Sequence, residues 1–163
     1  SLYAAKEGSS RVVTQFIAEW LLKRPLKLVD GGMQKRCFTY VDDGIAALLK
    51  ILENKDNLCK NEIINIGHPQ NECSVKELAI LLKNIFMSHP EHVNDCEYSQ
   101  IVEIPAETYY GKGYQDIYTR KPSILKAREL LDWTPTIGLE EAMQRTLYSF
   151  LEENTAPEAF NII

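Results

Sequence analysis

The residues of this chain that are best suited to chemistry lie close together, between positions 109 and 123. This stretch of fifteen residues contains four tyrosines, two glycines, three cationic side chains and the pair Gln115 and Asp116. Tyrosine rings offer faces for stacking, lysine and arginine bind phosphate and carboxylate groups, and glycine lets the backbone approach a ligand closely. An ordinary surface loop would lack the aromatic residues, and a core strand would not tolerate the charges. The composition therefore predicts a loop that closes over a large, polar, anionic ligand.

The net charge of −5 is distributed unevenly along the chain. Residues 1–36 contain seven Lys/Arg and three Asp/Glu, a local charge of +4, whereas residues 37–163 contain eleven and twenty, a local charge of −9. An acidic chain with one basic segment speaks against general nucleic-acid binding and favours a local anion site. Uneven surface charge without a ligand is the alternative interpretation.

Arg11 is the first cation of the basic segment with an informative position. Ser9 and Ser10 can each cap a helix whose apolar residues recur at helical spacing until Pro25 ends it. Arg11 is then expected in the first turn, where the helix dipole disfavours a cation. Either its side chain points into solvent, or a bound anion shares the helix N-terminus with it.

A second group of cations surrounds the Gly31–Gly32 pair. Strands are expected at 26–29 and 37–41, and the two glycines predict a turn that joins them as a hairpin. Lys27 precedes this turn, and Lys35 and Arg36 follow it. The edge of such a hairpin either faces a phosphate or is an ordinary solvated surface.

Helices and short strands alternate along the rest of the chain. Helices are expected to begin at Asp42 or Asp43, at Ser74 with a capping box to Glu77, at Ser123 and at Gly138. The first of these is expected to be a core helix, because four apolar residues share one of its faces (Ile45, Leu48, Leu49 and Leu52). A short buried strand is expected at 62–67 and a weaker one at 97–104. This pattern predicts an α/β or α+β arrangement with too few strands for a complete doubly wound sheet.

Cysteine and histidine placement does not favour a metal site. The four cysteines are scattered and form no C-x-x-C pair (Cys37, Cys59, Cys73 and Cys96). Reduced thiols of a cytoplasmic protein fit this pattern better than a disulfide does, and no zinc site is expected. The run from His89 to His92 suggests metal ligands, but a polar loop that closes a helix is the favoured interpretation. No apolar run approaches the roughly 20 residues that span a bilayer, and the first residues do not resemble a signal peptide.

The motifs of a complete nucleotide-dependent enzyme are missing from the sequence. Gly111-Lys112-Gly113 is the only G-x-G, and it lacks the third small residue, the preceding strand and the following helix of a dinucleotide fingerprint. There is no Tyr-x-x-x-Lys pair, Gly-x-Ser-x-Gly elbow or Walker loop. The chain contains residues suited to binding but no complete catalytic set.

Several of these segments together resemble a known family. Arg36–Asp43, Gly67 after Ile63–Ile66, and Leu131–Pro135 resemble the C-terminal half of extended short-chain dehydrogenase/reductases that act on nucleotide sugars. Lys27–Gly32, Gln34–Phe38, and the loop at Tyr109–Asp116 with Arg120–Ile124 resemble, more specifically, the UDP-glucuronic acid decarboxylase domain of ArnA-type bifunctional polymyxin-resistance proteins. The similarity covers roughly residues 8–152, and the tyrosine-rich loop is its most specific part.

The resemblance implies a division of labour within a longer protein. Residues 1–153 would be the C-terminal UDP-sugar-binding part of an NAD-dependent epimerase/dehydratase-type domain, and residues 154–163 a disordered tail. NAD would be bound by a missing N-terminal Rossmann half, and the resemblance suggests a formyltransferase domain ahead of that half in the parent protein. The fragment alone is expected to be inactive. A homo-oligomer is expected, without nucleic-acid binding or membrane insertion.

The reaction implied by the resemblance serves lipid A modification with 4-amino-4-deoxy-arabinose and so polymyxin resistance. NAD oxidises the 4-hydroxyl of UDP-glucuronate, and the resulting β-keto acid loses CO2 to give a UDP-4-keto-pentose. Arg120 matches the residue assigned as proton donor, although stabilisation of the enolate charge suits a guanidinium as well.

The substrate-binding positions follow from the same resemblance. Arg11 matches an arginine near the diphosphate, and Tyr114 matches a tyrosine that contacts the nucleotide. The remaining positions form one continuous segment: Lys27, Leu28, Val29, Asp30, Gly31, Gly32, Met33, Gln34, Lys35 and Arg36. Met33 stands where a lysine is common, so one contact is expected to differ. Two alternatives stay open, another nucleotide-sugar epimerase or dehydratase, and a non-catalytic nucleotide-sugar-binding module.

Overall fold

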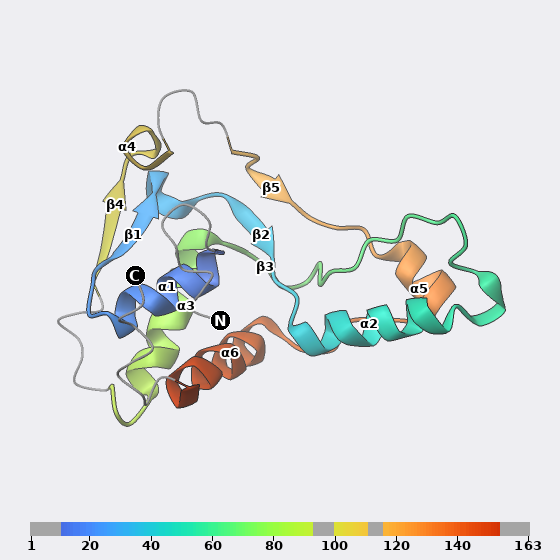
Figure 1. Cartoon of the computed structure of the whole chain (residues 1–163). Coiled ribbons are helices and arrows are strands. Elements are labelled where there is room, and N and C mark those ends of the chain that lie inside the picture. Colours follow the sequence, from blue (N-terminus) through green and yellow to red (C-terminus); the bar gives the residue numbers. More distant parts are fainter. Residues whose placement is uncertain (1–10, 93–99, 111–115, 154–163) are drawn as a thin grey trace. The chain divides into compact units, whose positions relative to one another are not determined.

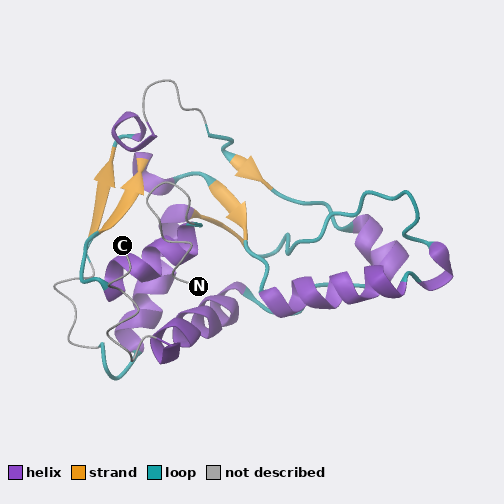
Figure 2. Ribbon diagram, viewed as in Figure 1, coloured by secondary structure: helices purple, strands orange, loops and turns teal. Residues whose placement is uncertain are grey.

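The computed structural model describes residues 11–92, 100–110 and 116–153 of the 163-residue chain. These residues form two compact units, which Figure 1 colours along the sequence. The first unit takes its described residues from segments 1–33, 74–116 and 143–163, and the second takes them from segments 34–73 and 117–142. Helices and short strands occur together (Figure 2), so the predicted α/β fold class is confirmed.

The first unit contains a two-stranded parallel sheet. β1 (Leu26–Val29) pairs with β4 (Ile101–Ile104), and the register places Leu26 opposite Ile101. Leu26 and Leu28 are buried while Lys27 between them is exposed, which is the period-two pattern of a strand with one covered face. The strand predicted at 26–29 is therefore confirmed.

Helices complete the core of the first unit. α1 (Val12–Leu21) packs against α3 (Val75–Ser88), and the ring of Trp20 stacks on Phe86 with centroids 5.7 Å apart. α4 (Ala106–Tyr110) follows β4, and α6 (Leu139–Glu153) is the last helix of the described residues. The large buried apolar side chains of this unit are Phe16, Ile17, Trp20, Leu26, Leu28, Leu78, Leu82, Ile85, Phe86, Met143, Leu147, Phe150 and Leu151.

The second unit contains a three-stranded sheet with the order β3-β2-β5 (Figure 1). β2 (Lys35–Cys37) lies in the middle, beside β3 (Glu72–Ser74) and the short β5 (Thr119–Arg120). α2 (Val41–Glu53) and α5 (Leu125–Leu131) contact each other. The small core at these helices contains Ala47, Ile124, Ala127, Leu131 and Trp133.

The predicted hairpin around Gly31–Gly32 is wrong. β1 pairs in parallel with β4, and β2 pairs in parallel with β5, so the two strands belong to different sheets. Residues 30–32 form a 3-10 turn (η2, Asp30–Gly32) and not a two-residue hairpin turn. The second strand also begins and ends earlier than predicted, because Val41 already starts α2. Parallel partners come from distant parts of the chain, and no local sequence signal identifies them.

The expectation that α2 is a core helix is also wrong for its main apolar face. Ile45, Leu48, Leu49 and Leu52 are between 49% and 79% exposed, whereas Ala47 is fully buried. Residues 62–67 form no strand among the described residues, and Ile63 is 85% exposed. Ile64 and Ile66 instead pack partly against the small core at α5. Apolar spacing predicted the faces correctly but could not say which face this chain covers.

Local sequence signals identified some N-cap residues correctly and others incorrectly. The capping box at Ser74 is confirmed, because its hydroxyl accepts a hydrogen bond from the Glu77 N–H at 3.1 Å and the Glu77 carboxylate accepts one from the Ser74 N–H at 2.7 Å. Asp43 does not cap α2, whose N-cap is Tyr40. Ser123 does not cap α5, whose N-cap is Ile124. Helix α1 begins after Arg11, which is itself the N-cap residue, and Ser9 and Ser10 lie outside the described residues.

Within the described residues, no helix combines the length and the apolar character that crossing a bilayer requires.

Candidate functional site

The turn after β1 is the part of the candidate site that lies in the first unit. Asp30, Gly31 and Gly32 have φ angles of 46°, 68° and 65°, a left-handed backbone that favours glycine. A Cβ at Gly32 would lie 2.9 Å from the backbone nitrogen of Lys76 in the first turn of α3. No L-side chain fits there without movement of the backbone, so Gly32 sets how closely the turn approaches α3.

Side chains from two other elements brace the same turn. The Asp30 carboxylate accepts a hydrogen bond from the N–H of Ala106, the first residue of α4, at 2.7 Å. Glu103 of β4 lies beside Gly31 and pairs with Lys76 at 3.9 Å, and both of these charged side chains are largely exposed. Asp30 is therefore engaged in holding α4, and the turn presents exposed Lys27 before it and exposed Met33 after it.

An arginine pair is the main feature of the second unit. The parallel register of β2 and β5 places Arg36 opposite Arg120 and Lys35 opposite Thr119. The Arg36 Nη1 donates to the carbonyl of Ile117 at 2.8 Å and to that of Lys35 at 2.7 Å, so this side chain leans toward the segment that leads into β5. Like charges at paired positions of neighbouring strands repel each other and are destabilising. An anion bound by both guanidinium groups would offset this repulsion and stabilise the pair.

The backbone after β5 is held by a close approach to Gly67. A Cβ at Gly67 would lie 2.6 Å from Cγ of Pro122, so only glycine lets the two segments approach this closely. Lys121 pairs with Glu72 of β3 at 3.2 Å. These two contacts hold the residues directly after β5, and so help to position Arg120 at its end.

Cys37 ends β2 beside this group of charges. Burial raises the pKa of its thiol, the negative charge of Glu72 raises it further, and Lys121 partly opposes both effects. Because the thiolate is the nucleophilic form, a raised pKa makes Cys37 a poor nucleophile near neutral pH. Cys37, Cys59 and Cys73 form no disulfide, and Cys96 lies outside the described residues.

The structure places the predicted site residues in two groups. Lys27–Met33 and Arg11 belong to the first unit, and Arg11 is exposed at the start of α1. Gln34–Arg36 and Arg120 belong to the second unit, where Lys35, Arg36 and Arg120 share one sheet. Tyr114 and the loop 111–115 lie outside the described residues, as do the side chains of Tyr109 and Tyr110.

The supporting roles of two residues were missed by sequence reasoning. Asn71 is buried and its amide donates to the carbonyls of Phe38 at 3.1 Å and Ile137 at 2.9 Å, which fixes the chain just after β2. Asp43 is buried and its carboxylate accepts hydrogen bonds from the N–H groups of Thr136 and Ile137, both at 3.0 Å. Their partners lie 33 to 94 residues away along the chain, so no spacing in the sequence could have indicated these roles.

Comparison with known proteins relates this architecture to one family. Residues 1–67 match the sequence model of the NAD dependent epimerase/dehydratase family. Among solved structures, the PbgP3 protein from Burkholderia pseudomallei is 37% identical, with a TM-score of 0.70 over 86% of this chain and 38% of that one. The UDP-glucose 4-epimerase of Thermotoga maritima, solved with UDP-glucose, is 27% identical, with a TM-score of 0.68 over 90% of this chain and 41% of that one.

A third structure supports the fold alone. The UDP-glucuronic acid 4-epimerase of Bacillus cereus, solved with UDP-glucuronic acid and NAD, is 24% identical, with a TM-score of 0.69 over 91% of this chain and 42% of that one. This chain spans about two fifths of the length of each of the three structures. Its mixed α/β fold matches part of the epimerase/dehydratase fold of the extended short-chain dehydrogenase/reductase type.

Proposed function

We propose that this chain is the UDP-sugar-binding part of an NAD-dependent UDP-glucuronate decarboxylase of the epimerase/dehydratase family. The parent protein would act in the cytoplasm, where free thiols persist, in the modification of lipid A that gives polymyxin resistance. The resemblance of the tyrosine-rich loop supports the decarboxylase over other members of the family. The 27% identity with a UDP-glucose-bound epimerase supports a UDP-sugar as ligand.

The observation that carries the proposal is the pairing of Arg36 with Arg120. Two guanidinium groups on adjacent strands would make a site for an anion, because a guanidinium can bind a carboxylate or phosphate through two hydrogen bonds. UDP-glucuronate carries both kinds of anion, a diphosphate and the C6 carboxylate. Of the two arginines, Arg120 is the more exposed and is therefore the better placed to meet a ligand.

In the proposed reaction, the residues of this part of the protein bind and orient the substrate and form no covalent bond with it. Once C4 of the sugar is a ketone, the carboxylate is β to it, and the C5–C6 bond breaks as its electron pair moves into an enolate. CO2 leaves, and a proton then adds to C5. Guanidinium groups stay protonated in proteins. Arg120 would therefore hold the carboxylate and stabilise the enolate charge, and would assist proton delivery by keeping that geometry.

Other predicted residues would hold the remainder of the ligand. Arg11 is proposed to contact the diphosphate and Tyr114 the nucleotide, as the resemblance implies. The segment Lys27–Arg36 would line the UDP-sugar, with Gly31 and Gly32 allowing close approach of its backbone.

The rest of the enzyme would lie in sequence that this chain does not contain. The sequence has no G-x-G-x-x-G and no Tyr-x-x-x-Lys, so its own residues do not fit NAD, and we assign that cofactor to a Rossmann half elsewhere in the parent. The exposed apolar face of α2 and exposed Ile63 would be covered by that half, because the relatives are more than twice as long as this chain. A formyltransferase domain and homo-oligomerisation are further expectations for the parent.

The direct test uses the parent protein, with UDP-glucuronate and NAD. We expect release of CO2 with formation of NADH and a UDP-4-keto-pentose. Arg120→Met should lower turnover by at least about 100-fold, because it removes a charge that stabilises the transition state, while UDP binding measured by calorimetry changes little. Arg128→Met, which removes an exposed arginine from α5 in the same unit, is the matched control and should leave both quantities unchanged.

Two results would contradict this assignment. Absence of NADH formation from UDP-glucuronate would rule out the decarboxylase. Equal losses of UDP affinity and turnover in Arg120→Met would make Arg120 an anchor for the nucleotide and not a participant in the chemistry.

An epimerase is the second candidate, because it is the activity named for the relative that is 27% identical. The same assay separates the two, since an epimerase would return a UDP-sugar with its carboxylate retained and would release no CO2. A non-catalytic binding module would bind UDP-sugars in the parent protein without forming NADH or any product.

A further inference from the structure

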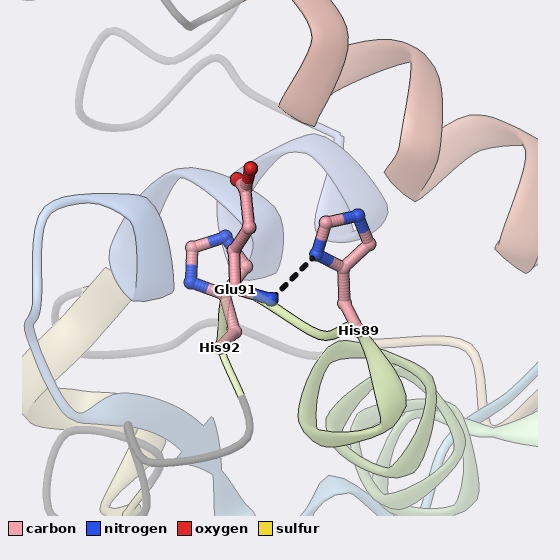
Figure 3. Close-up of side chains that lie close together, drawn as sticks. All are labelled: His89, Glu91 and His92. Carbon is pink, nitrogen blue, oxygen red and sulfur yellow. Dashed lines mark hydrogen bonds between the residues drawn. The ribbon is translucent and has the colours of Figure 1, made fainter.

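The loop that follows α3 gathers three side chains that can bind metal ions. His89, Glu91 and His92 each offer one ligand atom, and these atoms all lie within 4.8 Å of one another. Figure 3 shows the two imidazole rings on either side of the Glu91 side chain. Both histidines are half-buried and Glu91 is exposed. The group belongs wholly to the first unit, and none of the three is among the UDP-sugar-binding residues proposed above.

The backbone of this loop is held in a compact turn. The His92 N–H donates to the His89 carbonyl at 2.9 Å, and the Glu91 N–H donates to Nδ1 of His89 at 3.4 Å. Pro90 restricts φ between the first two ligands. The turn closed by the His92 N–H and the restricted Pro90 keep the three side chains close, which lowers the entropy lost when a metal binds.

Aromatic packing orients the two imidazole rings. His92 stacks on Phe86 of α3 with centroids 4.3 Å apart and an interplanar angle of 17°. His89 meets the ring of Tyr148 in α6 edge-on at 5.3 Å. The histidine rings themselves are tilted, with centroids 5.5 Å apart. Two rings held from different helices turn their edges toward the space beside Glu91.

We propose that His89, Glu91 and His92 form a site for a divalent transition-metal ion, with Zn²⁺ as the first choice. Two imidazole nitrogens and one carboxylate oxygen are a ligand set that zinc uses when three protein ligands leave the fourth position open. Imidazole also suits Ni²⁺ and Cu²⁺, whereas Mg²⁺ and Ca²⁺ prefer oxygen ligands alone. The site would fix the loop that follows α3 and leave one coordination position open.

The geometry needs only a modest adjustment. Zinc bonds of about 2.0–2.1 Å place tetrahedral ligand atoms roughly 3.3 Å apart, so the present atoms must move together by up to about 1.5 Å. Rotation of exposed Glu91 supplies part of this movement. The long hydrogen bond at His89 Nδ1 is weak, so its loss on metal binding costs little.

The test is a calorimetric titration of the untagged, metal-free chain with ZnCl2 at pH 7.5. We expect one equivalent of Zn²⁺ to bind, and binding to be lost on acidification because protons compete for imidazole nitrogen. His92→Phe keeps a ring to stack on Phe86 but removes a ligand, so it should weaken binding at least about tenfold. Glu91→Gln alters an exposed side chain that the fold does not need, and it should weaken binding by a similar factor.

The control is Glu107→Gln, which removes an exposed carboxylate of the same unit from outside the loop and should leave zinc affinity unchanged. A wild-type chain that binds no zinc would overturn the proposal. So would equal zinc affinities in the wild type and in both loop variants, because the histidines would then serve only the aromatic packing. Circular dichroism of each variant separates lost ligands from lost folding.

Discussion

At the scale of single residues, the charged side chains near Cys37 change the pKa of its thiol. Arg36 and Arg120 are paired on adjacent strands, and Lys121, directly after β5, forms an ion pair with Glu72 of β3. Besides burial, which raises it most, the pKa of the Cys37 thiol is raised by Glu72 and lowered by Lys121. The thiol is therefore a reporter placed beside the proposed anion site.

This environment predicts the effect of one neutral substitution on thiol reactivity. Glu72→Gln removes a negative charge that raises the pKa of Cys37, so the pKa falls and the thiolate fraction at a fixed pH rises. We expect alkylation of Cys37 by iodoacetamide at pH 8 to become about two- to threefold faster, a small factor because solvent screens the pair. Peptide-resolved mass spectrometry measures the rate at Cys37 apart from those of the other cysteines.

The difference between wild type and Glu72→Gln should shrink as the pH rises above both pKa values, because the thiol is then ionised in both proteins. Glu62→Gln is the control, since Glu62 pairs with Lys126 and does not act on Cys37. A rate that falls in Glu72→Gln would show that the lost ion pair with Lys121 outweighs the lost charge.

At the scale of elements, helix starts differ in how they are stabilised. α3 begins with a reciprocal capping box between Ser74 and Glu77. α5 begins at Leu125 without a side-chain cap, and the Ile124 carbonyl accepts the first helical hydrogen bond from Arg128. α2 begins with no side-chain cap, although Asp43 in its first turn binds the N–H groups of Thr136 and Ile137.

A pair of serine substitutions tests this difference. Ser74→Ala removes the cap of α3 and should lower the free energy of unfolding by about 1 kcal/mol. Ser123→Ala, just before α5, removes a hydroxyl that caps no helix and should change it by less than about 0.5 kcal/mol. Urea denaturation followed by circular dichroism measures both. Equal losses in the two variants would show that the capping box of α3 contributes no stability of its own.

At the scale of the whole molecule, the chain leaves apolar surface uncovered. The face of α2 that carries Leu48, Leu49 and Leu52 is more than half exposed, and Ile63 is more exposed still. Full burial of each such side chain is worth roughly 1.5–3 kcal/mol. We propose that this face is an interface in a longer parent protein, because the chain spans only about two fifths of the length of its relatives.

Leu52→Ser tests whether the parent protein covers this face. In the present chain Leu52 is 79% exposed, so the substitution should change the free energy of unfolding by less than about 0.5 kcal/mol. In the parent protein we expect a loss of about 2 kcal/mol, because the same side chain is then buried. Leu125→Ser, on the exposed side of α5, is the matched control. Small losses from Leu52→Ser in both proteins would contradict the proposed packing.

The residues of the proposed site could be named from the sequence, but their arrangement could not. Lys35, Arg36 and Arg120 were expected to bind an anion from their type and from the resemblance, yet nothing in the spacing predicts that Arg36 and Arg120 lie in register. That register follows from parallel pairing between segments far apart in the chain. Gly67 was recognised as part of a motif, but its close approach to Pro122 became visible only in three dimensions.

By itself, the sequence determined the features that rest on near neighbours. The alternation of β1, the capping box of α3 and the apolar spacing of α6 each depend on residues within a few positions of one another. Only the tertiary structure decided which strands pair, that Gly31–Gly32 makes no hairpin, and that the apolar face of α2 is exposed. The physical reason is that burial and parallel pairing depend on distant partners, whose positions no local pattern encodes.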